Sequence, residues 1–240
     1  MLFEGTPFEI NRIMIVRFIG VAIVVLVFWL AARSAKLVPG RFQNAVEMGL
    51  DFVRGQIAVE ILGEKLGRKY FPILATIFFS IFIFNITGVV PFLNIAGTSV
   101  VGLPLIFALW VFVLYIGGAV RKLGLGGFLK SSLFPPGVPK PLYLLLTPIE
   151  ALQVFLLRPA TLAIRLLANM MAGHLLLALC FSATSFFFFQ AAGGMKVFGL
   201  VTLPAGFAFF GLEVFVALLQ AYVFSILTAV YLQMTLEPEH

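Results

Sequence analysis

Charged side chains are scarce in this chain of 240 residues: only 11% are Asp, Glu, Lys or Arg, whereas 62% are hydrophobic. Soluble domains carry roughly 25% charged residues, so this scarcity excludes an ordinary soluble domain and predicts an integral membrane protein in a lipid bilayer. The net charge of +6 does not predict nucleic-acid binding. The basic residues cluster beside apolar segments, as orientation signals do, and leave no soluble basic face for nucleic acid.

Cysteine and histidine are almost absent as well. The only cysteine, Cys180, lies inside an apolar run, which excludes a disulfide within the chain. The two histidines, His174 and His240, are far apart and lack the spacing of metal ligands. We therefore expect neither a metal nor a cofactor. No internal repeat or low-complexity linker divides the chain, so residues 1–240 are expected to form a single all-α membrane domain.

Long apolar segments are what the chain has in abundance. Residues 13–32 form the first, and a helix of this length matches a hydrocarbon core of about 30 Å. A cleaved signal peptide remains an alternative here, because Arg12 precedes the segment and small residues follow it. Further spans are expected at 71–92 and 100–120. Within 41–65, apolar residues recur every three or four positions, which predicts an amphipathic helix on the membrane surface.

The basic residues predict the orientation in the membrane. Residues 33–69 contain seven Lys or Arg, and residues 121–140 contain four. Segments rich in Lys and Arg lie on the cytoplasmic side, and the two spans between these segments bring both to that side. The N-terminus is then outside and the C-terminus cytoplasmic, in a membrane that we expect to be the plasma membrane of a bacterium.

The C-terminal part of the chain holds two apolar segments that are too long for upright spans. Residues 142–190 and 197–236 are expected to form a helical hairpin that turns near Gly193 and Gly194. A helix of about 40 residues is roughly 60 Å long, about twice the thickness of the hydrocarbon core. We therefore expect a strongly tilted hairpin, and about five membrane segments in all.

Arg165 is the most informative residue, because it stands almost alone in an apolar region. Between 159 and 195 the only other basic or acidic side chain is His174. Arginine cannot lose its charge, and burying it in a membrane costs at least about 2.5 kcal/mol. Such a residue must face protein, a cavity or a counter-charge, and it marks by default a path for an ion or a substrate. A structural ion pair with Glu150 or Glu213 is the alternative.

Polar residues accompany Arg165 along its predicted helix. Thr161, Arg165, Asn169 and Gly173 recur every four residues, which predicts one shared helix face. Asn169 is then a hydrogen-bonding neighbour of Arg165, or alternatively a simple polar contact between helices. His174 is nine residues from Arg165, about 180° around the helix, and is expected to serve a different compartment.

A second polar stripe is predicted on the last helix. Glu213, Gln220 and Tyr231 are spaced so that their side chains lie within about 20° of one another. We expect Glu213 to pair with His174 across the hairpin. Histidine exchanges protons near neutral pH, so such a pair can pass a proton. The alternatives are a core histidine with satisfied hydrogen bonds and a glutamine that only joins two helices.

Asn85 and Glu150 are two further candidates. Asn85 lies in Phe-Asn-Ile-Thr-Gly near the end of a span, and its alternative role is local capping. Glu150 follows Thr147 and Pro148, a pattern typical of a helix start, and its alternative role is simply to begin a helix.

Three segments of the chain resemble subunit a of the F-type ATP synthase membrane sector. They are Arg-Pro-Ala-Thr-Leu-Ala-Ile-Arg-Leu-Leu-Ala-Asn-Met-Met-Ala-Gly-His at 158–174, the run 212–232 with Leu-Leu-Gln-Ala-Tyr-Val-Phe, and Asn-Ile-Thr-Gly-Val-Val-Pro at 85–91. The first two are highly specific when they occur together. The resemblance extends from the second span to the C-terminus. It implies a subunit of a proton-translocating ATP synthase that is not an enzyme by itself.

The resemblance also implies roles for individual residues. Arg165 would face a rotating ring of c subunits, with Asn169 and Gln220 as its polar neighbours. His174 and Glu213 stand where other members often have Glu and His, so the acid–base pair would be kept but exchanged.

Two positions depart from the family pattern. Asn85 would line the inlet half-channel, but many bacterial members have an Asp three residues later, where this chain has Gly88. The family's acidic residue before the bend is offset, here Glu150. Tyr231 and Glu150 complete the set of residues that we expect along the proton path.

The expected function is that of a proton-conducting stator. Protons would pass through two half-channels to and from the carboxylate of a c subunit and so drive rotation of the ring. The expected partners are the c-ring, the peripheral-stalk b subunits and the rest of the synthase. Two alternatives remain open: a secondary transporter with its substrate at Arg165, and a non-transporting membrane scaffold. Inverted repeats and paired broken helices, which are common in transporters, are not visible in the sequence.

Overall fold

The computed structural model describes residues 11–33, 36, 40–90, 97–133 and 142–236. Those residues contain no strand and form the α-helices α1 (Arg12–Arg33), α2 (Arg41–Val53), α3 (Glu60–Ile86), α4 (Gly102–Leu133), α5 (Tyr143–Leu152), α6 (Arg158–Phe189) and α7 (Gly199–Leu236). Within them, 5 helical stretches are long and apolar enough to cross a membrane, which confirms the predicted all-α membrane fold. The end of the predicted span 71–92, the last part of the basic segment 121–140 and the C-terminal residues 237–240 lie outside the described residues.

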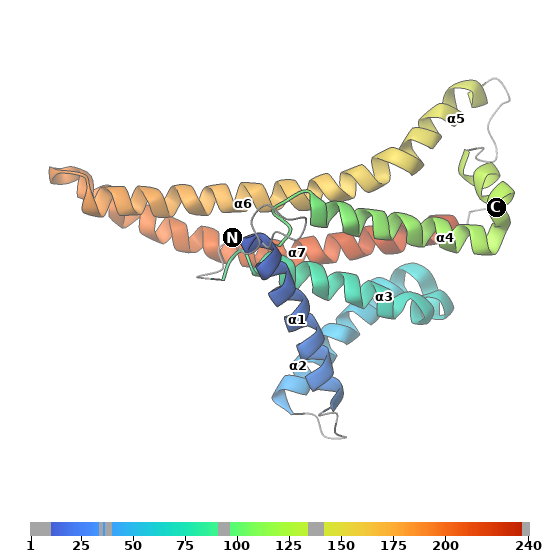
Figure 1. The fold of residues 1–240 in the computed structure, drawn as a ribbon, viewed down its shortest axis with the longest axis horizontal. Coiled ribbons are helices and arrows are strands. Elements are labelled where there is room, and N and C mark those ends of the chain that lie inside the picture. The colour runs from blue at the N-terminus through green and yellow to red at the C-terminus, as the bar shows by residue number, and fades with distance from the viewer. Residues whose placement is uncertain (1–10, 34–35, 37–39, 91–96, 134–141, 237–240) are drawn as a thin grey trace.

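Helices α6 and α7 form the predicted hairpin, and α5 continues the arm of α6 toward the opposite end of the molecule (Figure 1). They are joined by the 3₁₀ turn Gly193–Phe198, where Gly193 has a φ of 63° that favours glycine. The 38 residues of α7 make a helix about 57 Å long, which cannot stand upright in a hydrocarbon core of about 30 Å. Helix α1, whose 22 residues match one span, runs crosswise to the hairpin in Figure 1.

The chain reverses direction at Gly63. Helix α2 continues through the π-helical segment Arg54–Val59, and Gly63 then adopts a φ of 72° that breaks the helical path. After the reversal, Gly67 packs so closely that an added Cβ would lie 2.7 Å from the carbonyl oxygen of Ala58. The predicted amphipathic helix therefore ends at this reversal, and the following span is continuous with its returning arm.

The core lies where α3, α4 and α6 meet α7. One face of α7 carries small residues every four positions, and Ala217, Ala221, Ser225 and Ala229 are each 0% exposed. Small side chains allow close helix contact, which is how helices associate in an apolar solvent. The hydroxyl of Thr228 donates to the carbonyl of Phe224 at 2.8 Å, so this polar group is satisfied within its own helix.

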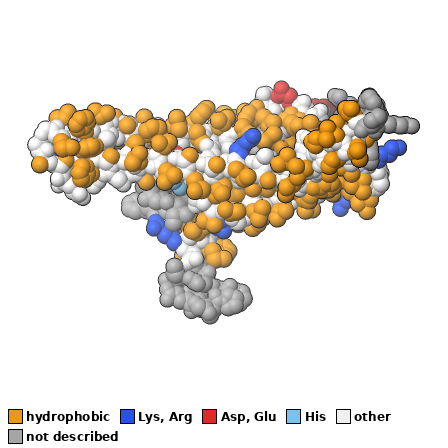
Figure 2. Space-filling view, turned by 90° about the horizontal axis from the view of Figure 1, so that it is seen from above, with side chains coloured by type: hydrophobic (Ala, Val, Ile, Leu, Met, Phe, Trp, Pro, Cys, Tyr) orange, Lys and Arg blue, Asp and Glu red, His pale blue; other side chains and the backbone are white. Residues whose placement is uncertain are grey.

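The surface of the molecule is apolar over much of its length. Figure 2 shows one long face that is covered mostly by hydrophobic side chains, with few charges. Leu144 and Leu175 are 88% and 67% exposed, which would be unfavourable in water. This surface suits contact with lipid chains or with other membrane subunits.

Candidate functional site

Arg165 lies on the outer face of α6. Its side chain is exposed, as are the small neighbours Ala168 and Ala172. Among the described residues, no carboxylate lies within ion-pair distance of Arg165, so the alternative of a structural ion pair with Glu150 or Glu213 is not realised. The fixed positive charge is therefore directed away from the core of the chain, toward whatever covers this face.

The stripe from Thr161 to Gly173 does not stay on one face, and this part of the prediction is wrong. Thr161 and Arg165 are exposed, whereas Asn169 and Gly173 turn toward α7. The physical reason is helical drift: four residues advance about 400°, so three such steps rotate the side chain by about 120°. The outward face near Arg165 instead continues through residues such as Ala168.

Asn169 and Gln220 connect α6 to α7 beside Arg165. The side-chain amide of Asn169 donates to Oε1 of Gln220 at 3.3 Å. Gln220 is only 4% exposed, and within the described part of the chain its Nε2 has no hydrogen-bond partner. This contact joins the two helices one turn away from Arg165, as the alternative of a polar contact between helices predicts; a role of the two amides toward Arg165 stays a prediction.

His174 and Glu213 form the predicted pair across the hairpin. Nδ1 of His174 lies 3.1 Å from Oε1 of Glu213, whose side chain is 3% exposed, whereas that of His174 is 25% exposed. Gly173 makes this approach possible, because a Cβ there would lie 2.9 Å from Oε1 of Glu213. The pair thus has a buried member and a partly open member, while Arg165 faces outward on the same helix.

A cavity of about 950 Å³ lies on the open side of this pair. His174, Gly88, Ser182, Phe207 and Arg12 are among the residues that line it. Most of the wall is apolar, so the imidazole and the Ser182 hydroxyl are its main polar groups along α6. Gly88, where the resemblance led us to expect an acid, does lie at this wall and contributes no side chain to it.

Sequence reasoning missed Ser182 and Arg12 as cavity residues. The spacing offered a signal for Ser182. His174, Ala178 and Ser182 follow one another at intervals of four residues, so the three side chains lie along one side of α6 and all line the cavity. No comparable signal existed for Arg12, because it belongs to α1 and reaches the cavity only through tertiary packing.

Asn85 lies in the core, with an exposure of 0%. Its Oδ1 accepts a hydrogen bond from the Thr98 hydroxyl at 2.7 Å, which ties the end of α3 to the chain before α4. Local capping is instead made by Thr87, whose hydroxyl donates to the Phe84 carbonyl at 2.8 Å. Asn85, three residues before Gly88 at the cavity wall, therefore connects the end of α3 to Thr98.

Tyr231 and Glu150 lie apart from the His174–Glu213 pair. Eighteen residues separate Glu213 from Tyr231, which is about 27 Å along α7. The Tyr231 ring lies under the guanidinium of Arg158, with 5.3 Å between Cζ and the ring centroid. Glu150 is half-buried in α5.

The helix-start interpretation of the segment before Glu150 is wrong. Helix α5 begins at Tyr143, so Thr147 and Pro148 lie inside it rather than at its N-terminus. The Thr147 hydroxyl donates to the Leu133 carbonyl at 3.3 Å, which makes it a tertiary contact and not a cap.

Comparison with known proteins covers nearly the whole chain. The family described as ATP synthase A chain matches residues 14–233. ATP synthase subunit a of Rhodococcus erythropolis is 45% identical over 100% of this chain and 87% of its own length. The proteins of the same name from Frankia alni and Streptomyces lividans are 38% and 34% identical, over 90% and 96% of this chain and 72% and 81% of their own lengths. The match includes both arms of the hairpin and the site between them, and the chain belongs to the ATP synthase A chain family.

Proposed function

We propose that this chain is the proton-conducting stator of the ATP synthase membrane sector. The observation that carries the proposal is the His174–Glu213 pair, joined at 3.1 Å beside a cavity of about 950 Å³. A proton that enters the cavity is accepted by the imidazole and shared with the buried carboxylate. From there it passes to a carboxylate on a c subunit, the ring turns, and the proton leaves through a second half-channel to the cytoplasm.

The contact between His174 and Glu213 suits proton transfer. With the proton on the imidazole the two side chains form an ion pair, and with the proton on the carboxylate both are neutral. Neither Glu213 oxygen makes a hydrogen bond of good geometry within the described residues, but 3.1 Å is short enough for a small side-chain rotation to align Nδ1 with Oε1. The proton can then move between them without rearrangement of the helices. The low exposure of Glu213 strengthens this coupling, because charges interact more strongly away from water.

Arg165 acts as a fixed charge between the two half-channels. A c-subunit carboxylate that approaches it is stabilised in its ionised form by Coulomb attraction, so the carboxylate releases its proton on approach. The same charge opposes a proton that would cross directly from one half-channel to the other. The outward direction of Arg165 and the lack of an ion-pair partner within the described residues support this role.

The arrangement of the basic residues supports a cytoplasmic C-terminus and an external N-terminus. Lys69 lies in α3 shortly after its reversal at Gly63, and Arg121 and Lys122 lie in α4 just before its break at Gly124, where φ is 74°. All three line one cavity, and Lys122 donates a hydrogen bond to the Leu236 carbonyl at the end of α7. These basic residues and the end of α7 therefore lie on one side of the protein. By the positive-inside rule that side is cytoplasmic, which places the cavity beside His174 toward the outside.

The inlet half-channel can be tested with thiol reagents. In a Cys180→Ser background, a small water-soluble thiol reagent applied from outside should block proton flux in the Ser182→Cys variant of the reconstituted synthase. The reason is that position 182 lines the cavity and its block would deny water access to the pair. Leu179→Cys is the control, because Leu179 is 68% exposed on the apolar surface. Equal sensitivity of both variants would contradict a water-filled inlet at this cavity.

The face that meets the ring can be tested by crosslinking. In the Cys180→Ser background, Ala168→Cys and Ala172→Cys should form disulfides with a cysteine placed next to the ring carboxylate, because both positions are exposed beside Arg165. Leu166→Cys and Met170→Cys should not, because these side chains are 0% and 1% exposed. Crosslinking yield on gels is the measurement. Similar yields at all four positions would mean that no defined face of α6 meets the ring.

A further inference from the structure

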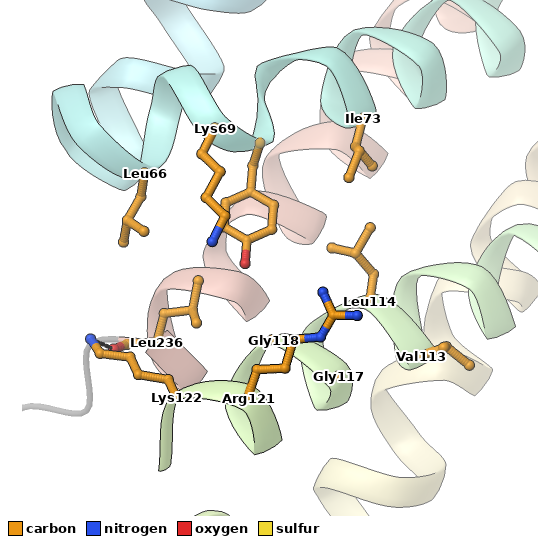
Figure 3. Close-up of a pocket in the computed structure, with 11 residues that line it drawn as sticks. Leu66, Lys69, Ile73, Val113, Leu114, Gly117, Gly118, Arg121, Lys122 and Leu236 are labelled. Carbon is orange, nitrogen blue, oxygen red and sulfur yellow. Dashed lines mark hydrogen bonds between the residues drawn. The ribbon is translucent and has the colours of Figure 1, made fainter. Parts of the chain in front are cut away.

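A second cavity lies at the basic end of the bundle, away from the proposed proton path. It measures about 570 Å³ and is lined by α3 after its reversal at Gly63, by α4 before its break at Gly124 and by the end of α7 (Figure 3). Lys69, Arg121 and Lys122 line it, and no acidic side chain does so among the described residues. Its volume lies within the range of about 300–1,000 Å³ that small-molecule sites occupy.

The three basic side chains differ in the contacts that they make within the protein. The ammonium of Lys122 donates to the Leu236 carbonyl. The ammonium of Lys69 lies 5.5 Å from the centroid of the Tyr70 ring and makes no hydrogen bond or ion pair with the residues that the structure describes. In Figure 3 the Lys69 ammonium and the Arg121 guanidinium both point into the cavity. Within the described part of the chain, Arg121 has neither an ion pair nor a hydrogen-bond partner. A guanidinium fork beside an ammonium is a geometry that matches phosphate oxygens.

The rest of the cavity is apolar. Ile73, Val113 and Leu114 form its apolar walls, with Leu114 beside the Arg121 guanidinium (Figure 3). Val113 precedes Arg121 by eight residues on α4, which is about 12 Å toward the membrane interior. It is 66% exposed, so the cavity continues into the lipid-facing surface. A free phosphate ion would contact only the basic end and leave these walls without a partner.

We infer that this cavity binds an anionic phospholipid. Lys69 and Arg121 hold the phosphate, and the first part of the acyl chains lies along Val113 and Leu114. Basic pockets between membrane helices on the cytoplasmic side suit such head groups, because cations at the interface attract anionic lipid while the chains stay in the apolar region. The site is independent of the His174–Glu213 pair, so its occupancy does not report on proton conduction.

Photolabelling of the assembled synthase tests this site. The complex is reconstituted in vesicles with a trace of phosphatidylglycerol that carries a diazirine in one acyl chain, and labelled residues are identified by mass spectrometry. Phosphatidylcholine with the same chain is the comparison lipid. We expect labels on cavity residues such as Val113 with phosphatidylglycerol only. Lys69→Gln and Arg121→Gln should each lower this labelling about fivefold, and together about 25-fold.

Matched variants separate the cavity from general surface charge. Lys65→Gln with Lys130→Gln removes the same charge at exposed positions outside the cavity lining, and labelling should persist. A second pair leaves every charge in place. Gly117→Phe fills the cavity and should abolish labelling, whereas Gly126→Phe should not, and a Cβ at either glycine meets nothing within 4 Å.

Four results would overturn the inference. Equal labelling by the two lipids would remove the preference for an anion, and equal loss in the Lys65→Gln/Lys130→Gln variant would reduce it to surface charge. Loss of the label with millimolar inorganic phosphate would identify a free-phosphate site. Labelling that appears only after Glu237→Gln and Glu239→Gln would mean that the acidic C-terminus occupies the cavity.

Discussion

Replacing Arg165 with Lys is expected to lower ATP synthesis driven by an imposed proton gradient by roughly 100-fold, because a charge-assisted contact of up to about 3 kcal/mol is lost. Lysine keeps the positive charge but lacks the planar fork, and it can release its proton when it is desolvated against a partner. Arg165 has no carboxylate partner among the described residues, which leaves the fork available for the proposed contact with a c-subunit carboxylate. Synthesis by the complex reconstituted in vesicles is the measurement.

Arg158→Lys is the matched control for this experiment. Arg158 lies on the same helix, but its guanidinium stacks over Tyr231 at 5.3 Å from the ring centroid. An ammonium can make the same cation–π contact, so we expect most of the synthesis activity to remain. Near-normal synthesis in Arg165→Lys, or equal losses in the two variants, would contradict the charge-gate mechanism.

The alternatives from the sequence predict different results in the same vesicles. A secondary transporter would move a small molecule without a c-ring, and a scaffold would tolerate loss of Arg165. Family membership already makes the chain part of an ATP synthase rather than an independent transporter. The vesicle assay tests in addition whether proton flux depends on the guanidinium of Arg165.

The sequence predicted the features that depend on local length and periodicity. The two arms of the hairpin, the turn at Gly193 and the meeting of His174 with Glu213 follow from apolar length and from two ionisable groups on facing arms. Such features need no knowledge of distant contacts, because helix geometry fixes them once the hairpin turn is placed.

The features that escaped prediction depend on packing between distant segments. The reversal at Gly63 depends on a positive φ, which no sequence pattern predicted. Arg12 reaches the cavity only because α1 packs beside α3. The drift of Asn169 toward α7 was missed because a four-residue repeat looks like one face over a single turn and departs from it over three. These contacts between distant segments decide which side chains face the cavity and which face the neighbouring helix.

Exchanging His174 and Glu213 is expected to restore proton flux that either single change removes. His174→Glu places a second carboxylate against Glu213 at about hydrogen-bond distance, and Glu213→His places two imidazoles there, so each single variant loses the acid–base pair. Each should slow flux by roughly tenfold or more, and the double variant should return to within a few-fold of the original. Proton flux in reconstituted vesicles, measured across a range of pH, is the assay.

A cross-hairpin contact without titratable groups provides the control. The hydroxyl of Thr184 donates to that of Thr202 at 2.9 Å, between the same two helices. Thr184→Val with Thr202→Val removes this bond and should leave both the flux and its pH profile nearly unchanged. The coupling of His174 with Glu213 would then be specific to proton exchange and not a general consequence of loosened packing. Losses that simply add in the double variant would mean that the two side chains act independently, and the inlet would need another acceptor.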